Sequence, residues 1–356
     1  MSVFFLAAFS NPVWAADNGK NERELSIDAA VDLALGYSKD LQKNRLTIES
    51  DEEMLKLAQD NLLYTPIGPT EAASRAAYSA YLSADMNLVM NKKSKSTIED
   101  QTAYSVFSRY VGVLTALDSY YYAEANLKNE QKKLSIARVS YSVGIISKYE
   151  LEQAEIRFIT TQQSKETALV DLNTAYISFN TLLGLNMNER PLLTDKPAYS
   201  VLVTDDVEKQ IIRVIDNNPQ IWRAEKLIEI AEIQRDLLPF NSGTDTFYNR
   251  ALEVNKAQVS SAQAKEAVKQ AVRTTYNNII KMEEQYASAQ EEIKAAENTL
   301  KLTKVRYEVG FATESEVIAA EVALINAQNR LSSLVYSHEL GKIAYEKPWA
   351  ISSGSQ

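Results

Sequence analysis

The amino-acid sequence predicts a mainly α-helical protein, built from two tandem structural repeats of long antiparallel coiled-coil helix hairpins. Three observations support this fold class. Only 10 Gly and 8 Pro occur among 356 residues, about 5% together against roughly 12% in average proteins, so little interrupts a helix. A segment at 139–150 returns in similar form at 305–316. Apolar residues follow heptad spacing over long stretches. We therefore expect an elongated molecule of thin helical layers.

The repeated segment has the features of one helix ending and another beginning at once. Each copy combines a glycine suited to a left-handed helix end, an N-cap Ser or Thr, and a Glu three residues later, at Gly144, Ser147 and Glu150 and again at Gly310, Thr313 and Glu316. A Glu at that spacing can return a hydrogen bond to the N-cap residue. The two segments therefore predict two helix hairpins with very short tips.

A heptad seam follows the first tip. Ten positions are spaced alternately three and four residues apart, namely Leu151, Ala154, Phe158, Thr161, Lys165, Ala168, Leu172, Ala175, Phe179 and Leu182. The spacing returns from Val317 to Leu334. Such a pattern winds helices into a left-handed supercoil. A hairpin cannot bury its apolar seam alone, so we expect the protein to form oligomers.

The chain divides into five parts, of which residues 1–15 are the first. Residues 16–184 form the first repeat, 185–205 a connector, 206–347 the second repeat, and 348–356 a frayed, disordered tail. Within the first repeat, helical spacing begins at Leu25 and stops near Leu63, and 65–95 is the least regular stretch. In the connector, 198–203 has the composition of one short strand.

Residues 1–15 are typical of a secretory signal peptide. An apolar run from Val3 to Phe9 is followed by Val13-Trp14-Ala15, with compact residues at the positions that a signal peptidase reads. A positively charged start is missing, and the alternative is a buried N-terminal segment. After residue 15 no run approaches the ~20 apolar residues of a membrane helix. We expect an exported chain without a helical anchor.

Charge and chemistry exclude several classes of function. The formal charge is −9 with acids and bases interleaved, whereas nucleic-acid binding needs a concentrated basic face. The chain has no Cys and one His. His338 follows Val335 at the position where a Glu-x-x-His metal motif needs Glu, so an exposed or core histidine is expected. Phosphate loops and nucleophile elbows are missing too. We expect no enzyme, cofactor or metal.

The duplicated pattern resembles the TolC family of outer-membrane efflux proteins. The motif is Tyr-x-Val-Gly, then Ser or Thr, two residues, Glu, an apolar residue, two residues and Ala, carried twice on heptad helices. The second half opens with Asn218-Pro219-Gln220-Ile221. The resemblance covers about 25–347. It implies a homotrimer whose helices form a hollow periplasmic cylinder and whose strands form a shared outer-membrane β-barrel. It also implies partners, a periplasmic adaptor protein and an inner-membrane pump, and transport of solutes or peptides without chemistry.

The sequence departs from this family in the strands. Membrane strands need ~9–11 alternating residues, but Pro239 and Ala251 leave room for barely one. Between Pro66 and Ser96 there is room, yet Arg75 to Leu82 has a helical pattern. We expect barrel strands that are reduced or absent. An alternative function is therefore a secreted coiled-coil structural scaffold without a pore.

The resemblance implies a gate near the tips. By position, Tyr307 matches the gate tyrosine, Glu150 its acidic partner, and Glu316 an entrance acid, whereas Ala312 and Ala319 replace an arginine and a second acid. A ring of Glu316 side chains would attract cations. The alternative is that Glu150 and Glu316 only complete capping boxes and that Tyr307 is a core residue.

The tips themselves carry apolar residues and are the expected adaptor contact. These residues are Gly144, Ile145, Ile146 and Ser147 in the first tip and Gly310, Phe311, Ala312 and Thr313 in the second. Exposed apolar residues on short tips usually mark a partner. Packing between neighbouring tips of a closed trimer is the alternative.

Overall fold

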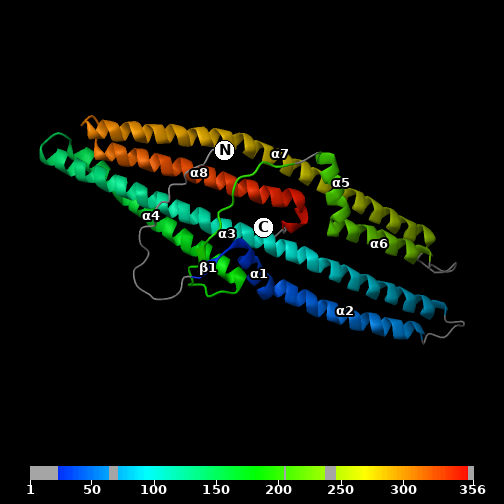
Figure 1. The fold of residues 1–356 in the computed structure, drawn as a ribbon. Coiled ribbons are helices and arrows are strands. Elements are labelled where there is room, and N and C mark those ends of the chain that lie inside the picture. Colours follow the sequence, from blue (N-terminus) through cyan, green and yellow to red (C-terminus); the bar gives the residue numbers. More distant parts are fainter. Residues whose placement is uncertain (1–22, 64–70, 204–205, 237–245, 352–356) are drawn as a thin grey trace.

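The computed structural model describes residues 23–63, 71–203, 206–236 and 246–351. These residues form an elongated bundle in which the long helices run side by side (Figure 1). The first repeat contains α1 (Ile27–Tyr37), α2 (Lys39–Leu63), α3 (Glu71–Ser142) and α4 (Lys148–Leu183). The second contains α5 (Val207–Asn217), α6 (Pro219–Asp236), α7 (Phe247–Glu308) and α8 (Glu314–Glu346). The predicted mainly α-helical fold is confirmed.

The two repeats correspond element by element. α1 and α5 each have 11 residues, and their N-caps are Ser26 and Asp206. α3 and α7 are the longest helices and return through α4 and α8. Packing follows the same order, since Tyr110 meets Phe179 edge to face at 5.8 Å and the equivalent rings of Tyr276 and Tyr345 lie 5.9 Å apart. The tandem duplication thus extends to the aromatic core.

The four long helices form a layer in the order α4, α3, α8, α7. α3 packs against both α4 and α8, and α8 packs against α7. α4 and α7 therefore lie at opposite edges of this layer (Figure 1). The α3–α4 and α7–α8 turns lie together at one end of the bundle, while α2 and α6 extend toward the other.

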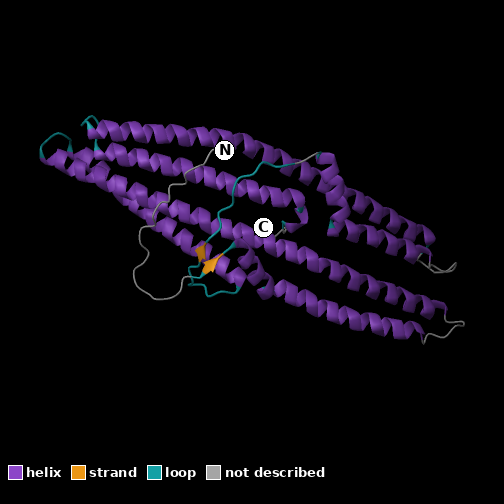
Figure 2. Cartoon of the chain, in the orientation of Figure 1, coloured by secondary structure: helices purple, strands orange, loops and turns teal. Residues whose placement is uncertain are grey.

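The connector folds back onto the start of the chain. β1 (Glu24–Leu25) pairs in parallel with β2 (Leu192–Leu193), and these are the only strands of the described residues (Figure 2). The predicted strand at 198–203 is wrong, and so is the helical start at Leu25. Leu25 is extended because of a contact with a distant segment. The Tyr110 hydroxyl donates to Leu25 O at 3.1 Å and accepts from Asp195 N at 2.9 Å.

Two further boundary predictions need correction. Residues 71–95, expected to be the least regular stretch, belong to α3, which confirms the helical pattern at 75–82 and fills most of the stretch between Pro66 and Ser96. The tail is ordered at Pro348–Ala350, where a 3-10 helix, η1, forms. Trp349 holds it in place, because its indole N–H donates to Asp100 at 2.8 Å. The signal peptide at 1–15 lies outside the described residues.

None of the described helices combines the length and apolar content needed to cross a lipid bilayer. The longest, α3 and α7, carry charged side chains throughout.

Tyr110→Phe should destabilise the protein without changing its shape. The substitution keeps the buried ring but removes a hydroxyl that bridges Leu25 O and Asp195 N, so we expect a loss of about 1–3 kcal/mol in chemical denaturation. Tyr276→Phe is the matched control, because this equivalent ring is only half-buried and should cost less than about 0.5 kcal/mol. Equal losses at both positions would contradict this account of the connector.

Candidate functional sites at the hairpin tips and the connector

Both tips have the same backbone geometry. Gly144 and Gly310 adopt left-handed φ angles of 78° and 80°, as the sequence predicted. In each tip the residue after the glycine donates back across the turn, Ile145 N to Ser140 O at 2.8 Å and Phe311 N to Arg306 O at 2.7 Å. These bonds satisfy carbonyls that a helix end leaves open. A side chain at either glycine would be strained by the backbone angle alone.

Both predicted capping boxes are present. Ser147 N and Thr313 N donate to the carboxylates of Glu150 and Glu316 at 2.7 and 2.6 Å. The Glu backbone N–H groups donate in return to the Ser147 and Thr313 hydroxyls at 3.3 and 3.2 Å. The bonds from backbone N–H first, and from the hydroxyls second, lower the pKa of Glu150 and Glu316. Both side chains are therefore held as carboxylates.

The apolar tip residues are exposed to different degrees. Ile145 and Phe311 are 76% and 77% exposed, while Ile146 and Ala312 are half-buried beneath them. Val143 and Tyr149 at the first tip and Val309 at the second are also exposed, at 63%, 68% and 61%, so each tip presents more than one apolar side chain to solvent. Such side chains normally pack against another molecule.

The expected gate residues Tyr307 and Glu150 lie on different helices, α7 and α4, and are not joined. Tyr307 is 47% exposed on α7, and the hydrogen bonds of the described residues include none between Tyr307 and Glu150. An arginine that sequence reasoning missed lies at this tip. The Arg306 guanidinium donates to Phe311 O at 3.2 Å and helps to lower the pKa of Glu316. Its place directly before Tyr307 was the available signal.

Ion pairs brace the tips at equivalent positions. Arg138 pairs with Glu155 at 3.4 Å across the first hairpin, and Lys304 with Glu321 at 3.1 Å across the second. Lys132 of α3 also pairs with Glu314 of α8 and so joins the two repeats beside the tips. These pairs are exposed, so each contributes only about 0–1 kcal/mol. They fix the register more than they stabilise the fold.

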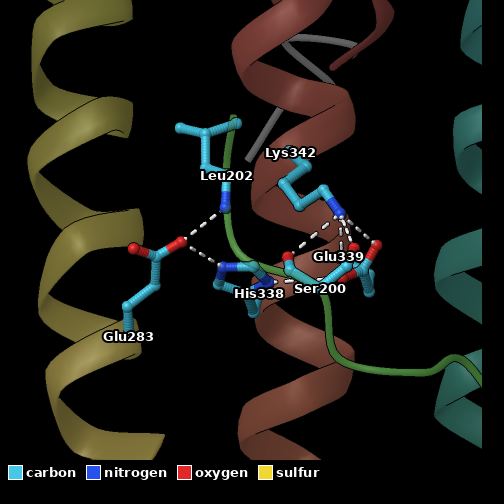
Figure 3. A network of polar contacts seen from close by, with 6 residues as sticks. All are labelled: Ser200, Leu202, Glu283, His338, Glu339 and Lys342. Atoms are coloured by element: carbon cyan, nitrogen blue, oxygen red, sulfur yellow. Dashed lines mark hydrogen bonds and ion pairs between the residues drawn. The ribbon is translucent and has the colours of Figure 1, made fainter. Parts of the chain in front are cut away.

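A second polar site joins the connector to the second repeat. His338 of α8 is 1% exposed, in line with one of the two expectations for it. Its Nε2 faces Glu283 of α7 at 3.2 Å, and its Nδ1 faces Glu339 at 3.3 Å. Figure 3 shows these three side chains beside the connector, with Leu202 N donating to Glu283 at 2.7 Å. Among the described residues no group of three side chains is suited to hold a metal ion.

The connector is held there by two further contacts. Lys342 donates to Ser200 Oγ at 2.5 Å and to Glu339 at 3.0 Å (Figure 3). The Tyr199 ring stacks on Tyr286 at 3.6 Å. Burial, the nearby Glu283 charge and Tyr286 raise the pKa of Tyr199, so its phenol stays neutral. This cluster was not predicted from the sequence, because its members come from three separate segments.

Comparison with known proteins gives a likeness in structure only. No family model and no curated protein matches the sequence. The solved outer-membrane channel OprN is similar with a TM-score of 0.70 at 12% identity, covering 91% of this chain and 90% of OprN. The CmeC channel of Campylobacter jejuni gives 0.62 at 12% identity, covering 93% and 87%. VceC of Vibrio cholerae gives 0.61 at 14% identity, covering 90% and 95%.

These likenesses show that the chain has the fold of outer-membrane channels along nearly its whole length. They confirm, at the level of the fold, the TolC resemblance carried by the tip motif and the heptads.

Ser147→Ala should raise the pKa of Glu150 and leave that of Glu316 unchanged. The hydroxyl donates to Glu150 at 2.9 Å, and the intact box at Thr313 serves as an internal control. NMR titration of the two carboxyl carbons measures both values. Because the folded pKa is lowered, the wild-type contribution is present above the unfolded value and is lost as pH falls through the folded one. An unchanged Glu150 titration would contradict the box as the cause.

Proposed function

We propose that the protein is one subunit of a TolC-like export duct, a homotrimer that passes solutes or peptides across the cell envelope without chemistry. The chain would be exported to the periplasm and outer membrane and would act with a periplasmic adaptor and an inner-membrane pump. The channel fold of OprN, CmeC and VceC supports this proposal. The observation that carries it is an uncovered helix face on α4.

The equivalent face of α8 is covered within the chain. It consists of residues spaced by seven, Ser315, Val322, Asn329, Tyr336 and Ile343, all buried or half-buried. Asn329 donates to Asp118 O of α3 at 2.8 Å, and Tyr336 belongs to the core formed with α3. This stripe is therefore the surface on which α3 packs.

The same stripe on α4 is exposed. The equivalent residues are Tyr149, Ile156, Gln163, Val170 and Ile177, and every one is exposed. Val170 is 60% exposed where Tyr336 is 5%, and Ile156 is 55% exposed where Val322 is 8%. Four of these side chains are apolar, and at this spacing they form a coiled-coil surface that no other described residue covers.

α7 carries the complementary uncovered face. α3 meets the second repeat through Lys93, Asp100, Asp118 and Lys132, all half-buried. Their equivalents on α7, namely Val259, Glu266, Glu284 and Asn298, are exposed. We infer that α7 of one copy packs on α4 of the next as α3 packs on α8. Because α4 and α7 lie at opposite edges, copies join head to tail and can close a ring.

A groove beside α4 agrees with this register. It has a volume of about 830 Å³ and is lined by residues of α1, α2, α3 and α4, among them Lys43, Arg109 and Thr181. Asp100 of α3 occupies the equivalent place beside α8 of the second repeat, where it pairs with Lys347 at 2.7 Å. Glu266 of a neighbouring copy would occupy the groove in the same way, and its charge complements Lys43 and Arg109.

In such a ring the tips would gather at one end. Glu316, Glu150 and Tyr307 would then face the narrow entrance and form the gate, with Arg306 as a further cation there. Ile145 and Phe311 would project from the ring toward the adaptor. The alternative, a structural scaffold without a pore, is favoured by one observation: strands of the described residues are limited to Glu24–Leu25 and Leu192–Leu193.

Imaging and conductance separate the duct from the scaffold. We expect purified mature protein to form hollow ring-shaped particles by electron microscopy and to give stepwise currents in a planar bilayer. Val170→Glu should yield monomers in sedimentation and no current, because it places a charge in the seam. Thr167→Glu is the matched control, since Thr167 and its equivalent Ser333 are both exposed. Solid rods without current would exclude the duct and favour the scaffold. A stable wild-type monomer would exclude both proposals.

The register can be tested by cross-linking, because the chain has no cysteine of its own. Gln163→Cys with Glu284→Cys, equivalent to the Asn329–Asp118 contact, should give a ladder of linked chains with a short bifunctional thiol reagent. Lys148→Cys with Asn298→Cys, equivalent to Glu314 and Lys132, should do the same. Gln163→Cys with Asn298→Cys is the mismatched control. A ladder that ends at three chains supports a trimer; linking only in the mismatched pair refutes the register.

A further inference from the structure

The sole histidine of the chain, His338, lies between two carboxylates, and each carboxylate can accept a hydrogen bond from one ring nitrogen. Nε2 faces Glu283 Oε1 at 3.2 Å and Nδ1 faces Glu339 Oε1 at 3.3 Å. A neutral imidazole has one N–H and one bare nitrogen, whereas the imidazolium has two N–H groups. Only the protonated ring can therefore donate to both carboxylates. In the neutral ring one lone pair faces a carboxylate oxygen.

The charges around the ring favour the same form. His338 is 1% exposed, and the side chains of Glu283 and Glu339 are 15% and 18% exposed. Lys342 pairs with Glu339 at 3.0 Å. The Tyr199 and Tyr286 rings also pack here, and burial raises the pKa of Tyr199, so this phenol adds no charge. Two carboxylates and one ammonium leave one negative charge, which the imidazolium neutralises.

The carboxylate that His338 orients is also the anchor of the connector. Glu283 Oε1 accepts both from the imidazole and from Leu202 N, the latter at 2.7 Å. Three residues earlier, Tyr199 lies 5.1 Å from the imidazole ring and stacks on Tyr286. This segment leads directly into α5, and it is the covalent link between the two repeats. The carboxylate that holds this link is thus in direct contact with the imidazole.

We propose that His338 is a proton-dependent clasp for the connector, which closes on protonation and loosens when the imidazole loses its proton. The imidazolium bonds to Glu283 and Glu339 together, keeps the Glu283 carboxylate aimed at Leu202 N, and fixes residues 199–202 on α7 and α8. Loss of the proton breaks one of the two bonds and returns an uncompensated charge to a buried site. The clasp belongs to the folded chain and does not depend on whether the protein forms a duct.

The sign of the pH dependence follows from this chemistry. Protonation strengthens the folded contact, so the connector is held more tightly when the imidazole gains a proton, toward lower pH, and less tightly when it loses the proton. Hydrogen exchange at Leu202 N–H reports the opening. We expect its protection to drop about tenfold or more from the protonated to the neutral ring, the change expected for one charge-assisted hydrogen bond.

The test uses untagged full-length protein labelled with ¹⁵N in histidine, so that one imidazole gives all the signal. We expect both ring nitrogens to carry protons when the connector is closed, and the imidazole titration and the Leu202 exchange to share one midpoint. His338→Gln should abolish the pH dependence of Leu202 exchange, and Glu283→Gln should weaken it. Glu297→Gln is the control on an exposed glutamate of the same helix and should leave the pH dependence of Leu202 exchange unchanged.

Two results would overturn the clasp. One is Leu202 protection that does not follow the imidazole titration in the wild type. The other is a ring that keeps a bare nitrogen while the connector is closed, which would place the proton on a carboxylate. Circular dichroism of His338→Gln checks folding, and the Glu283→Gln pH profile decides the question if that variant is unstable.

Discussion

The packing of α3 on α8 is the contact on which the arrangement of the molecule depends. Each hairpin buries one face of its returning helix, and a second face remains. Within the chain that second face is covered once, where the stripe from Ser315 to Ile343 meets α3. The duplication supplies the same stripe on α4, and there none of the described residues covers it. One internal contact therefore describes both the fold of the subunit and the surface through which copies would join.

The connector joins the two repeats, and polar contacts anchor it at both ends. At one end the Tyr110 hydroxyl bridges Leu25 of β1 and Asp195, which lies two residues after β2. At the other, His338, Glu283 and Lys342 bind residues 200–202 to the second repeat. Both anchors are polar groups at buried or half-buried positions, where an unpaired donor or acceptor is costly. The connector is thus a positioned structural element and not a slack linker.

The tips differ from the rest because they could be derived from local rules. A left-handed glycine, an N-cap hydroxyl and a glutamate three residues later define a hairpin turn almost without reference to other segments. The structure has both boxes as the spacing indicated. It also explains the gate acids in a simpler way, since Glu150 and Glu316 each close their own box. Their carboxylates remain charged, so the same side chains can serve a ring of negative charge at an entrance.

The sequence by itself determined the duplication, the long helices, the heptad seams and the two tips, because each depends on spacing along one segment. Only the tertiary structure decided the β1–β2 pair, the ordered η1 after residue 347 and the cluster around His338. In each of these cases the partners are far apart in sequence, as Leu25 is from Leu193 or Asp100 from Trp349. Periodicity reports which face of a helix is apolar. What covers that face depends on how the helices come together in space.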